Sequence, residues 1–269
     1  MNESDLIVAA GAYLGSKEVL GKLLGPTAEY LGGGLKSLTE RGVNNVNRVF
    51  ASAIAKLGNR IEDDGAIPPR VFRAVLENGY FCDDELTTEY FGGVLASSRT
   101  TISRDDRGTS FVHLLETLSA YQIRAHYVLY TAFNRAFASN TANIGRVSIR
   151  DKLKLFVPQT AFDRLMAFTD DEDATVLTSH CLSGLINAGL LRGSTWGDPS
   201  IIQHNHDVTV PCNGILIRTD SQGIELFQWA HGIGSQPIQT FPTDGRVHPD
   251  MLAIDFADLG VQAFDQNAK

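Results

Sequence analysis

The longest regular pattern in this sequence is an apolar stripe at helical spacing between residues 35 and 61. Its members are aliphatic or aromatic residues that recur mostly every three or four positions: Leu35, Leu38, Val46, Val49, Phe50, Ala53, Leu57 and Ile61. This spacing places the apolar side chains on one face of a helix, and that face must be covered by a core or by another helix. The stripe therefore predicts a long amphipathic helix, which Asp63-Asp64-Gly65 ends.

Further helices are expected before residue 140. The sequence Ile67-Pro68-Pro69 begins the next element with a proline suited to the first turn of a short helix, which runs to Asn78-Gly79. Asp83 is a candidate N-cap for the amphipathic segment that ends at residue 97. After a polar loop comes the apolar segment 109–118, and Ser119 is expected to cap the long helical segment that follows it. The first half of the chain is therefore predicted to be helical throughout.

Composition and charge narrow the class of protein. With 269 residues, 43% hydrophobic and 20% charged, the chain can bury the core of one large domain or two modest ones. Its net charge of -8 gives no overall attraction to nucleic-acid phosphates. Three widely spaced cysteines, Cys82, Cys181 and Cys212, do not predict a disulfide framework. The acidic start MNESD lacks the basic region of a signal peptide, so a cytoplasmic location is expected.

The N-terminal segment is apolar and unusually rich in glycine. Two pairs of glycines, Gly11 with Gly15 and Gly21 with Gly25, have the G-x-x-x-G spacing that lets another backbone approach one face of a helix. Each internal glycine also costs a helix about 1 kcal/mol relative to alanine, so such a helix needs partners. A helix packed within its own domain, an oligomer contact and membrane insertion all fit this pattern.

The second half has a mixed composition. Residues 148–168 and 173–192 have helical patterns, with Pro158 interrupting the first and Asp170 or Asp171 as the cap of the second. Asn213-Gly214 separates two β-rich runs and predicts a hairpin, which a further helix follows. This order resembles a winged-helix module. Because the expected recognition helix carries a run of acids and few bases, sequence-specific DNA binding is not expected.

The expected fold is mainly α, with an N-terminal helical domain followed by a smaller α+β winged-helix-like module. Four regions are predicted: a glycine-rich apolar helix at 1–24, a helical domain at 25–140, the winged-helix-like domain at 141–232 and a C-terminal extension at 233–269. The small polar stretch near residue 140 is the expected linker between the two domains.

Several motifs of the first half resemble the abortive-infection alpha family. They are GPTAEYLGGGL at 25–35, IPPRVFRAVLENG at 67–79 and DDELTTEYFGGVLAS at 83–97, in the order and spacing of that family. The resemblance covers roughly residues 20 to 135. It implies a role in bacterial antiviral defence, in which infected cells stop growing or die, and it brings no catalytic residues. Some members are associated with membranes or stand in operons beside nucleotide-polymerising enzymes, as in Hailong-type systems.

A loop in this region is the candidate ligand site. Arg99, Arg104 and Arg107 lie between two predicted helices among threonine, serine and aspartate residues. Guanidinium and hydroxyl groups together bind phosphate, so a nucleotide or oligonucleotide is the candidate ligand. The alternative is a solvated loop in which the arginines pair with Asp105 and Asp106.

The sequence presents no recognisable catalytic set, and no cofactor or metal is expected. His204, His206 and Cys212 lack a fourth local ligand for zinc. The acids at 170–173 are explained by the dipole of the helix that they precede. Usable serine-histidine-aspartate, phosphate-loop and Cys-x-x-Cys motifs are missing from the sequence. The chain is therefore predicted to be a non-enzymatic protein.

The expected function is that of an antiviral effector whose N-terminal helices are held in a resting homo-oligomer. Infection releases them to disrupt or form a pore in the inner membrane, with a nucleotide ligand and a nucleotidyltransferase-type operon partner as the expected control. Lys17, Glu18 and Lys22 oppose deep insertion unless they line a pore. The competing hypothesis is a cytoplasmic winged-helix regulator that binds DNA or protein, and a metal-dependent nuclease ranks below both.

Overall fold

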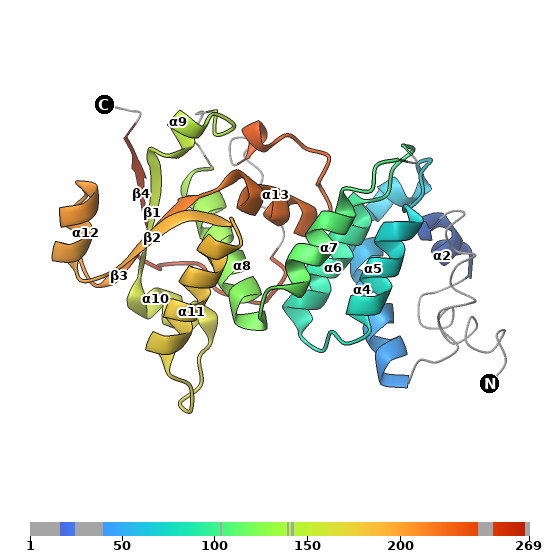
Figure 1. Cartoon of the computed structure of the whole chain (residues 1–269), viewed down its shortest axis with the longest axis horizontal. Helices are drawn as coiled ribbons and strands as arrows, with labels where there is room; N and C mark the ends of the chain where they lie inside the picture. Colours follow the sequence, from blue (N-terminus) through green and yellow to red (C-terminus); the bar gives the residue numbers. More distant parts are fainter. Residues whose placement is uncertain are drawn as a thin grey trace. The chain divides into compact units, whose positions relative to one another are not determined.

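The computed structural model describes residues 17–24, 40–102, 104–138, 140, 143–241 and 250–266. Within them it is rich in helix and contains a small antiparallel sheet of four strands (Figure 1). The expectation of a mainly helical chain with some β-structure is confirmed at this level. The predicted helix at 1–24 lies outside the described residues except for its end, α2 (Lys17–Leu24).

Contacts between residues divide the chain into two compact units. Unit 1 takes its described residues from Met1–Thr117 and Gln228–Ser235, and unit 2 from Leu118–Phe227 and Gln236–Lys269. The division falls at residue 117 and not at the predicted linker near residue 140. The reason is helix α8 (Ala120–Ala136), which buries most of its side chains among the elements of unit 2.

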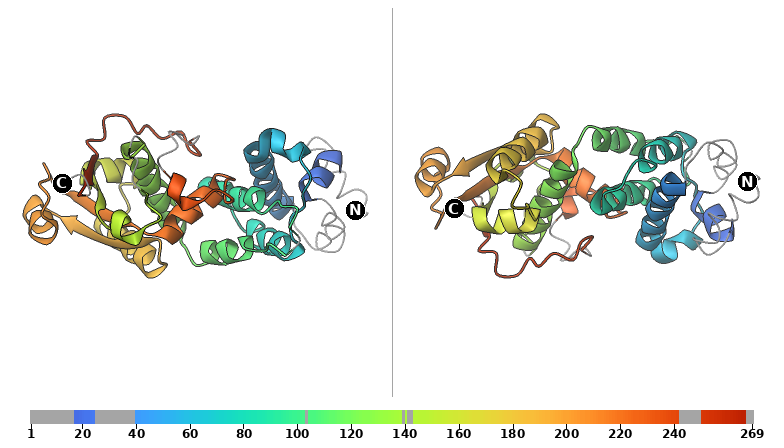
Figure 2. Two further views of the ribbon diagram at one scale, coloured as in Figure 1. Left: turned by 90° about the horizontal axis from the view of Figure 1, so that it is seen from above. Right: turned by 90° about the horizontal axis from the view of Figure 1, so that it is seen from below.

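Unit 1 is a group of packed helices, drawn from blue to green in Figure 2. After α2 they are α4 (Glu40–Leu57), the 3₁₀ helix η3 (Gly58–Glu62), α5 (Pro69–Gly79), α6 (Glu85–Ser97) and α7 (Gly108–Glu116). The predicted apolar stripe is buried on α4, where Val46, Val49, Phe50, Ala53 and Leu57 are at most 4% exposed. Gly92 lets α6 approach α4 closely, because a Cβ there would lie 2.3 Å from Ser52 Oγ.

Local capping signals set the ends of these helices. Pro69 is the first residue of α5, as its fixed φ angle favours. Asp84, and not the predicted Asp83, caps α6 by accepting a hydrogen bond from the backbone N–H of Thr87 at 2.8 Å. The returning segment Gln228–Ser235 completes unit 1, where the Trp229 ring stacks on Phe111 at a centroid distance of 4.6 Å.

Unit 2 contains the sheet. Its helices are α8 (Ala120–Ala136), α9 (Val147–Arg150), α10 (Gln159–Met166), α11 (Ala174–Asn187), α12 (Pro199–His206), α13 (Ser221–Ala230, whose last three residues belong to unit 1) and the 3₁₀ helix η4 (Ile238–Thr240). Its strands are β1 (Leu153–Pro158), β2 (Leu191–Gly197), β3 (Gly214–Thr219) and β4 (Gln262–Asp265). The strand order is β2-β3-β1-β4, and each neighbouring pair is antiparallel.

The register separates the two faces of this sheet. Phe156 lies opposite Leu216, and Leu155 lies opposite Ile217. Because side chains alternate along a strand, Phe156 and Leu216 share one face. There they form a small apolar cluster with residues from α12 and the segment after it: Ile202, Val208 and Val210. Helices α8 and α10 pack against the sheet as well, and Ser119 begins α8 with the predicted N-cap as part of a capping box.

Two sequence predictions about the strands of unit 2 were wrong. Residues 153–158, predicted as part of a helix, form strand β1, whose six residues are all buried. A strand buried on both faces reads as a continuous apolar run, which periodicity does not distinguish from helix. Residues 207–212 form no strand of the predicted Asn213-Gly214 hairpin; β3 pairs instead with β1 and β2.

Candidate functional site

Arg99, the first arginine of the predicted ligand loop, donates hydrogen bonds to backbone carbonyl groups. Its Nε donates to the carbonyl of Lys22 at 3.1 Å, and its Nη1 donates to that of Arg60 at 3.0 Å. Its Nη2 donates to the carbonyls of Ile61 and Asp63. Arg99 therefore ties α2 and η3 together, and its donors are committed to this structure and not to a ligand.

The other two arginines of the loop differ from Arg99. Arg107 forms a bidentate ion pair with Asp105, with N–O distances of 2.8 and 2.9 Å. Its guanidinium carbon lies 5.7 Å from the centre of the Trp229 ring. The hydrogen bonds from Arg107 lower the pKa of the Asp105 carboxyl. Arg104 is exposed. The loop thus brings Arg104 and Arg107 to the surface, while Arg99 faces the helices.

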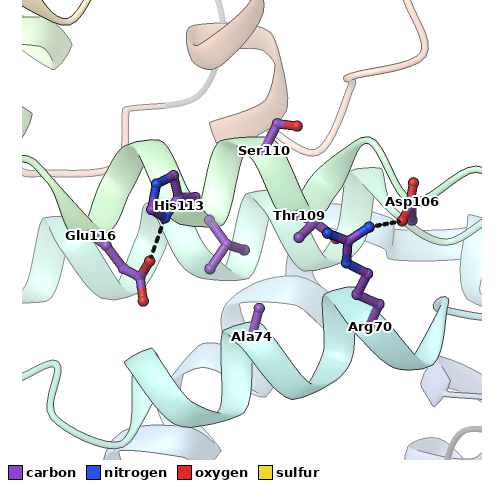
Figure 3. A pocket seen from close by; sticks show the side chains of 8 residues that line it. Arg70, Ala74, Asp106, Thr109, Ser110, His113 and Glu116 are labelled. Atoms are coloured by element: carbon purple, nitrogen blue, oxygen red, sulfur yellow. Dashed lines mark hydrogen bonds and ion pairs between the residues drawn. The ribbon is translucent and has the colours of Figure 1, made fainter.

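The same loop leads into an open groove between α5 and α7 (Figure 3). The groove has a volume of about 360 Å³, and its charged lining residues form pairs. Arg70 Nη1 lies 2.9 Å from Asp106 Oδ2, and His113 Nδ1 lies 3.0 Å from Glu116 Oε2. Thr109 and Ser110 add hydroxyl groups at the start of α7. No sequence motif indicates this groove, because its residues come from two helices and the loop before one of them.

Helix α2 packs against the rest of unit 1 through apolar and polar contacts. Leu23 and Leu24 are fully buried, and Lys22 Nζ lies 2.9 Å from both carboxylate oxygens of Glu62. Gly21, one of the predicted packing glycines, faces open space, since a Cβ there would meet nothing within 4 Å. Its predicted partners Gly11, Gly15 and Gly25 lie outside the described residues. Among the helices that the structure describes, none has the length and apolar character needed to cross a bilayer.

Helix α11, the predicted recognition helix, presents a neutral surface. Its N-cap is Asp173 and not the predicted Asp170 or Asp171. Asp173 accepts hydrogen bonds from the backbone N–H groups of Thr175 and Val176. Val176 and Ile186 are 61% and 37% exposed, and Ser183 is exposed between them. The acids before the helix have structural contacts too, since Glu172 bonds the Tyr121 hydroxyl and the backbone N–H of Thr169. Helix α11 carries no lysine or arginine, the side chains that phosphate contacts need.

A serine and a histidine meet at the start of α8. Ser119 Oγ lies 3.0 Å from His180 Nε2, and it also accepts a hydrogen bond from the backbone N–H of Gln122 as the helix cap. Within the part of the chain that the structure describes, no carboxylate bonds His180. The pair therefore lacks the third group that orients a histidine base.

The candidate zinc ligands His204, His206 and Cys212 do not form a metal site. His204 and His206 lie on helix α12 and not on a strand, and His206 Nε2 bonds Thr195 Oγ1 at 2.6 Å. Cys212 is exposed on the segment before β3. In the described ranges, no three histidine, cysteine, aspartate or glutamate side chains are grouped as a metal site would require.

Comparison of the chain with protein-family models, with curated proteins and with solved structures found no match in any of the three.

Proposed function

We propose that this chain is a non-enzymatic bacterial antiviral effector, in which α2 is held on unit 1 at rest and is released to act on the inner membrane. The observation that carries the proposal is the docking of α2 by Arg99, which bonds the Lys22 carbonyl, and by the ion pair of Lys22 with Glu62. The resemblance of residues 20–135 to the abortive-infection alpha family supplies the biological setting.

The energetics of this docking suit a release mechanism. A helix of eight residues is unstable alone in water, so α2 depends on its contacts with unit 1. Burying Leu23 and Leu24 contributes roughly 1.5–3 kcal/mol each, as an upper estimate. The side chains of Lys22 and Glu62 are 37% and 64% exposed, so their ion pair contributes about 1 kcal/mol or less. A ligand whose binding is coupled to release by a few kcal/mol would offset a large part of this.

The arginine loop links the proposed ligand to α2. A nucleotide or oligonucleotide phosphate would contact Arg104 and Arg107, and movement of the loop would displace Arg99 from the Lys22 carbonyl. Ala66 and Thr100 exchange backbone hydrogen bonds at 2.9 and 3.0 Å, which fix the start of the loop beside Arg99. A nucleotidyltransferase-type operon partner would supply the ligand. A homo-oligomer would allow Lys17, Glu18 and Lys22 of several copies to line a pore.

Membrane potential in bacteria that express the full chain tests this function. The Arg99→Gln variant should depolarise cells more readily than the original chain, because it loses hydrogen bonds that hold α2. Deletion of residues 1–24 should abolish depolarisation. The control is Arg73→Gln, which removes the same charge from an exposed arginine that pairs with Glu77, and it should change nothing. A full chain that leaves the membrane polarised during phage infection would rule out the membrane function.

The alternative function is a winged-helix regulator. The order α8-β1-α10-α11-β2-β3, with β3 between β1 and β2, is consistent with a winged-helix module in which α12 is inserted between the two wing strands. The neutral exposed face of α11, with Val176 and Ile186, favours a protein partner over DNA. Val176→Asp should then disrupt self-association in light scattering, whereas Thr175→Asp at the exposed start of the helix should not. A gel shift with random-sequence DNA would favour the DNA-binding version.

A further inference from the structure

Basic side chains gather on the face of the sheet that carries the small apolar cluster. Lys154 lies on β1, Arg218 on β3 and His206 at the end of α12. Since Leu155 lies opposite Ile217, Lys154 and Arg218 occupy the next opposite positions of the antiparallel pair. Like charges directly opposite each other destabilise a sheet. The opposite positions of Lys154 and Arg218 therefore do not stabilise the sheet, and another role must account for these two cations.

The contacts of these residues bring further polar groups together. Lys154 is 8% exposed, and its Nζ donates to the carbonyl of His206 at 3.1 Å. His206 Nε2 lies 2.6 Å from Thr195 Oγ1 on β2. The Arg218 guanidinium extends over Gly193, where a Cβ would lie 2.9 Å from Nη2. Four elements of unit 2 thus direct basic and hydroxyl groups into one region.

This cluster has little compensating negative charge. Within the described residues, neither Lys154 nor Arg218 forms an ion pair with a carboxylate, although the exposed Asp207 acts on Lys154. Burial and the charge of Arg218 lower the pKa of Lys154, and burial, Lys154 and Arg218 lower the pKa of His206. In contrast, Arg192 of β2 pairs with Asp151 at 2.8 Å.

We propose that Lys154, Arg218, His206 and Thr195 form a binding site for the phosphate group of a small anionic ligand. An anion would replace the missing carboxylate: Arg218 offers its forked donors, Lys154 a point charge and Thr195 a hydroxyl. Because Lys154 is almost covered, a single phosphate group reaches it and an extended nucleic acid does not. Phe264, which lies opposite Lys154 on β4 and is half-buried, provides an aromatic surface beside the phosphate.

Titration calorimetry of the full chain with inorganic pyrophosphate, at low salt, tests this site. Arg218→Gln should weaken binding by about tenfold or more, because it removes a charged hydrogen-bonding partner. Arg192→Gln is the matched control: it removes an arginine of the same sheet whose charge Asp151 already compensates, and it should leave binding within about twofold. A parallel titration with adenosine triphosphate identifies the source, since tighter binding than pyrophosphate indicates a nucleotide and equal binding indicates free phosphate.

The pH dependence gives a second readout. Lys154 and Arg218 lower the pKa of His206, and the negative charge of a bound anion raises it again. His206 therefore takes up a proton when the anion binds. Asp207 is the exposed carboxylate that acts on this cluster. The affinity should therefore rise as the pH falls from 8 to 6, and His206→Gln should flatten this dependence. Absence of pyrophosphate binding at millimolar concentration, or equal binding by the original chain and Arg218→Gln, would overturn the proposal.

Discussion

Lys56 of unit 1 and Lys154 of unit 2 are both largely removed from water, and the surroundings of the two lysines differ. Lys56 in unit 1 forms an ion pair with Glu89, and Ser52 bonds both groups. Lys154 in unit 2 bonds a backbone carbonyl and lies across the strand pair from Arg218. Burial lowers the pKa of both lysines, but a carboxylate hydrogen bond opposes this only at Lys56. The first arrangement is complete within the fold, whereas the second gains from an added anion.

Charged side chains that protein groups already bond are structural, whereas those without such partners are available to a ligand. In unit 1, Arg99 is used by backbone carbonyls and Arg70 pairs with Asp106. These groups stabilise helices and loops as they stand. In unit 2 the basic cluster lacks such partners among the described residues, and this is why the proposed phosphate site is placed there.

The largest expected effect comes from breaking the compensated pair. Glu89→Gln should lower the free energy of unfolding by about 3 kcal/mol, because it leaves the Lys56 ammonium, whose side chain is 12% exposed, without its counter-charge. Urea unfolding measures the loss. Glu77→Gln breaks the exposed pair with Arg73 and should cost about 0.5 kcal/mol or less. Equal losses in the two variants would show that burial does not decide the importance of these pairs.

The second prediction concerns His126, a buried base in unit 2 that stays neutral. Burial lowers its pKa to about 3, while the hydrogen bond of Nε2 with the Gly223 carbonyl, at 3.0 Å, partly opposes this. Because the folded pKa lies below the unfolded value near 6.5, the unfolded state binds more protons between these two values. The free energy of unfolding should therefore fall by about 2 to 3 kcal/mol between pH 7.5 and 4.5.

Denaturant unfolding across this pH range measures the effect, and His126→Gln isolates it. Glutamine keeps a donor for the Gly223 carbonyl but binds no proton, so the variant should have a flatter pH dependence than the original chain. If both proteins lose stability in parallel, His126 is not the group that acid titrates.

The third prediction compares two arginines of one loop. Arg99→Gln should lower the free energy of unfolding by about 2 kcal/mol, since it leaves several backbone carbonyls without a charged donor. Arg104→Gln should stay within about 0.5 kcal/mol, as expected of an exposed side chain. Amide hydrogen exchange should also show weaker protection of α2 in Arg99→Gln alone. Unchanged protection of α2 in that variant would remove Arg99 from the proposed release mechanism.

The sequence predicts the helices between α4 and α8 well because their signals are local. The apolar stripe of α4, Pro69 at the start of α5 and the cap Ser119 of α8 each depend on neighbours within a few turns. Strand β1 was missed because its fully buried run lacks alternation, and its partners β3 and β4 are far along the chain.

Site residues, too, can be predicted only where their signals are local. A loop motif brought Arg99, Arg104 and Arg107 to attention, but the sequence did not indicate that Arg99 bonds carbonyls of η3. The basic cluster of unit 2 could not be predicted, because only the strand register places Lys154 beside Arg218 and only the packing of α12 on the sheet places His206 beside Lys154. Side chains that meet through strand pairing leave no spacing pattern in the sequence.

The smallest expected effect has the opposite sign and concerns the uncompensated lysine. Lys154→Met keeps an unbranched side chain of similar size but removes a largely buried charge that lies opposite Arg218. It should raise the free energy of unfolding by about 1 kcal/mol in urea, because replacing a buried charge by a hydrophobic residue is often stabilising. Lys152→Met, at an exposed position just before β1, should change stability by about 0.5 kcal/mol or less.

A loss of stability in Lys154→Met would mean that its bond to the His206 carbonyl holds α12 in place, and the contrast with Lys56 would then be one of degree. A gain in stability together with loss of pyrophosphate binding would show that unit 2 keeps Lys154 for its ligand at a cost in stability.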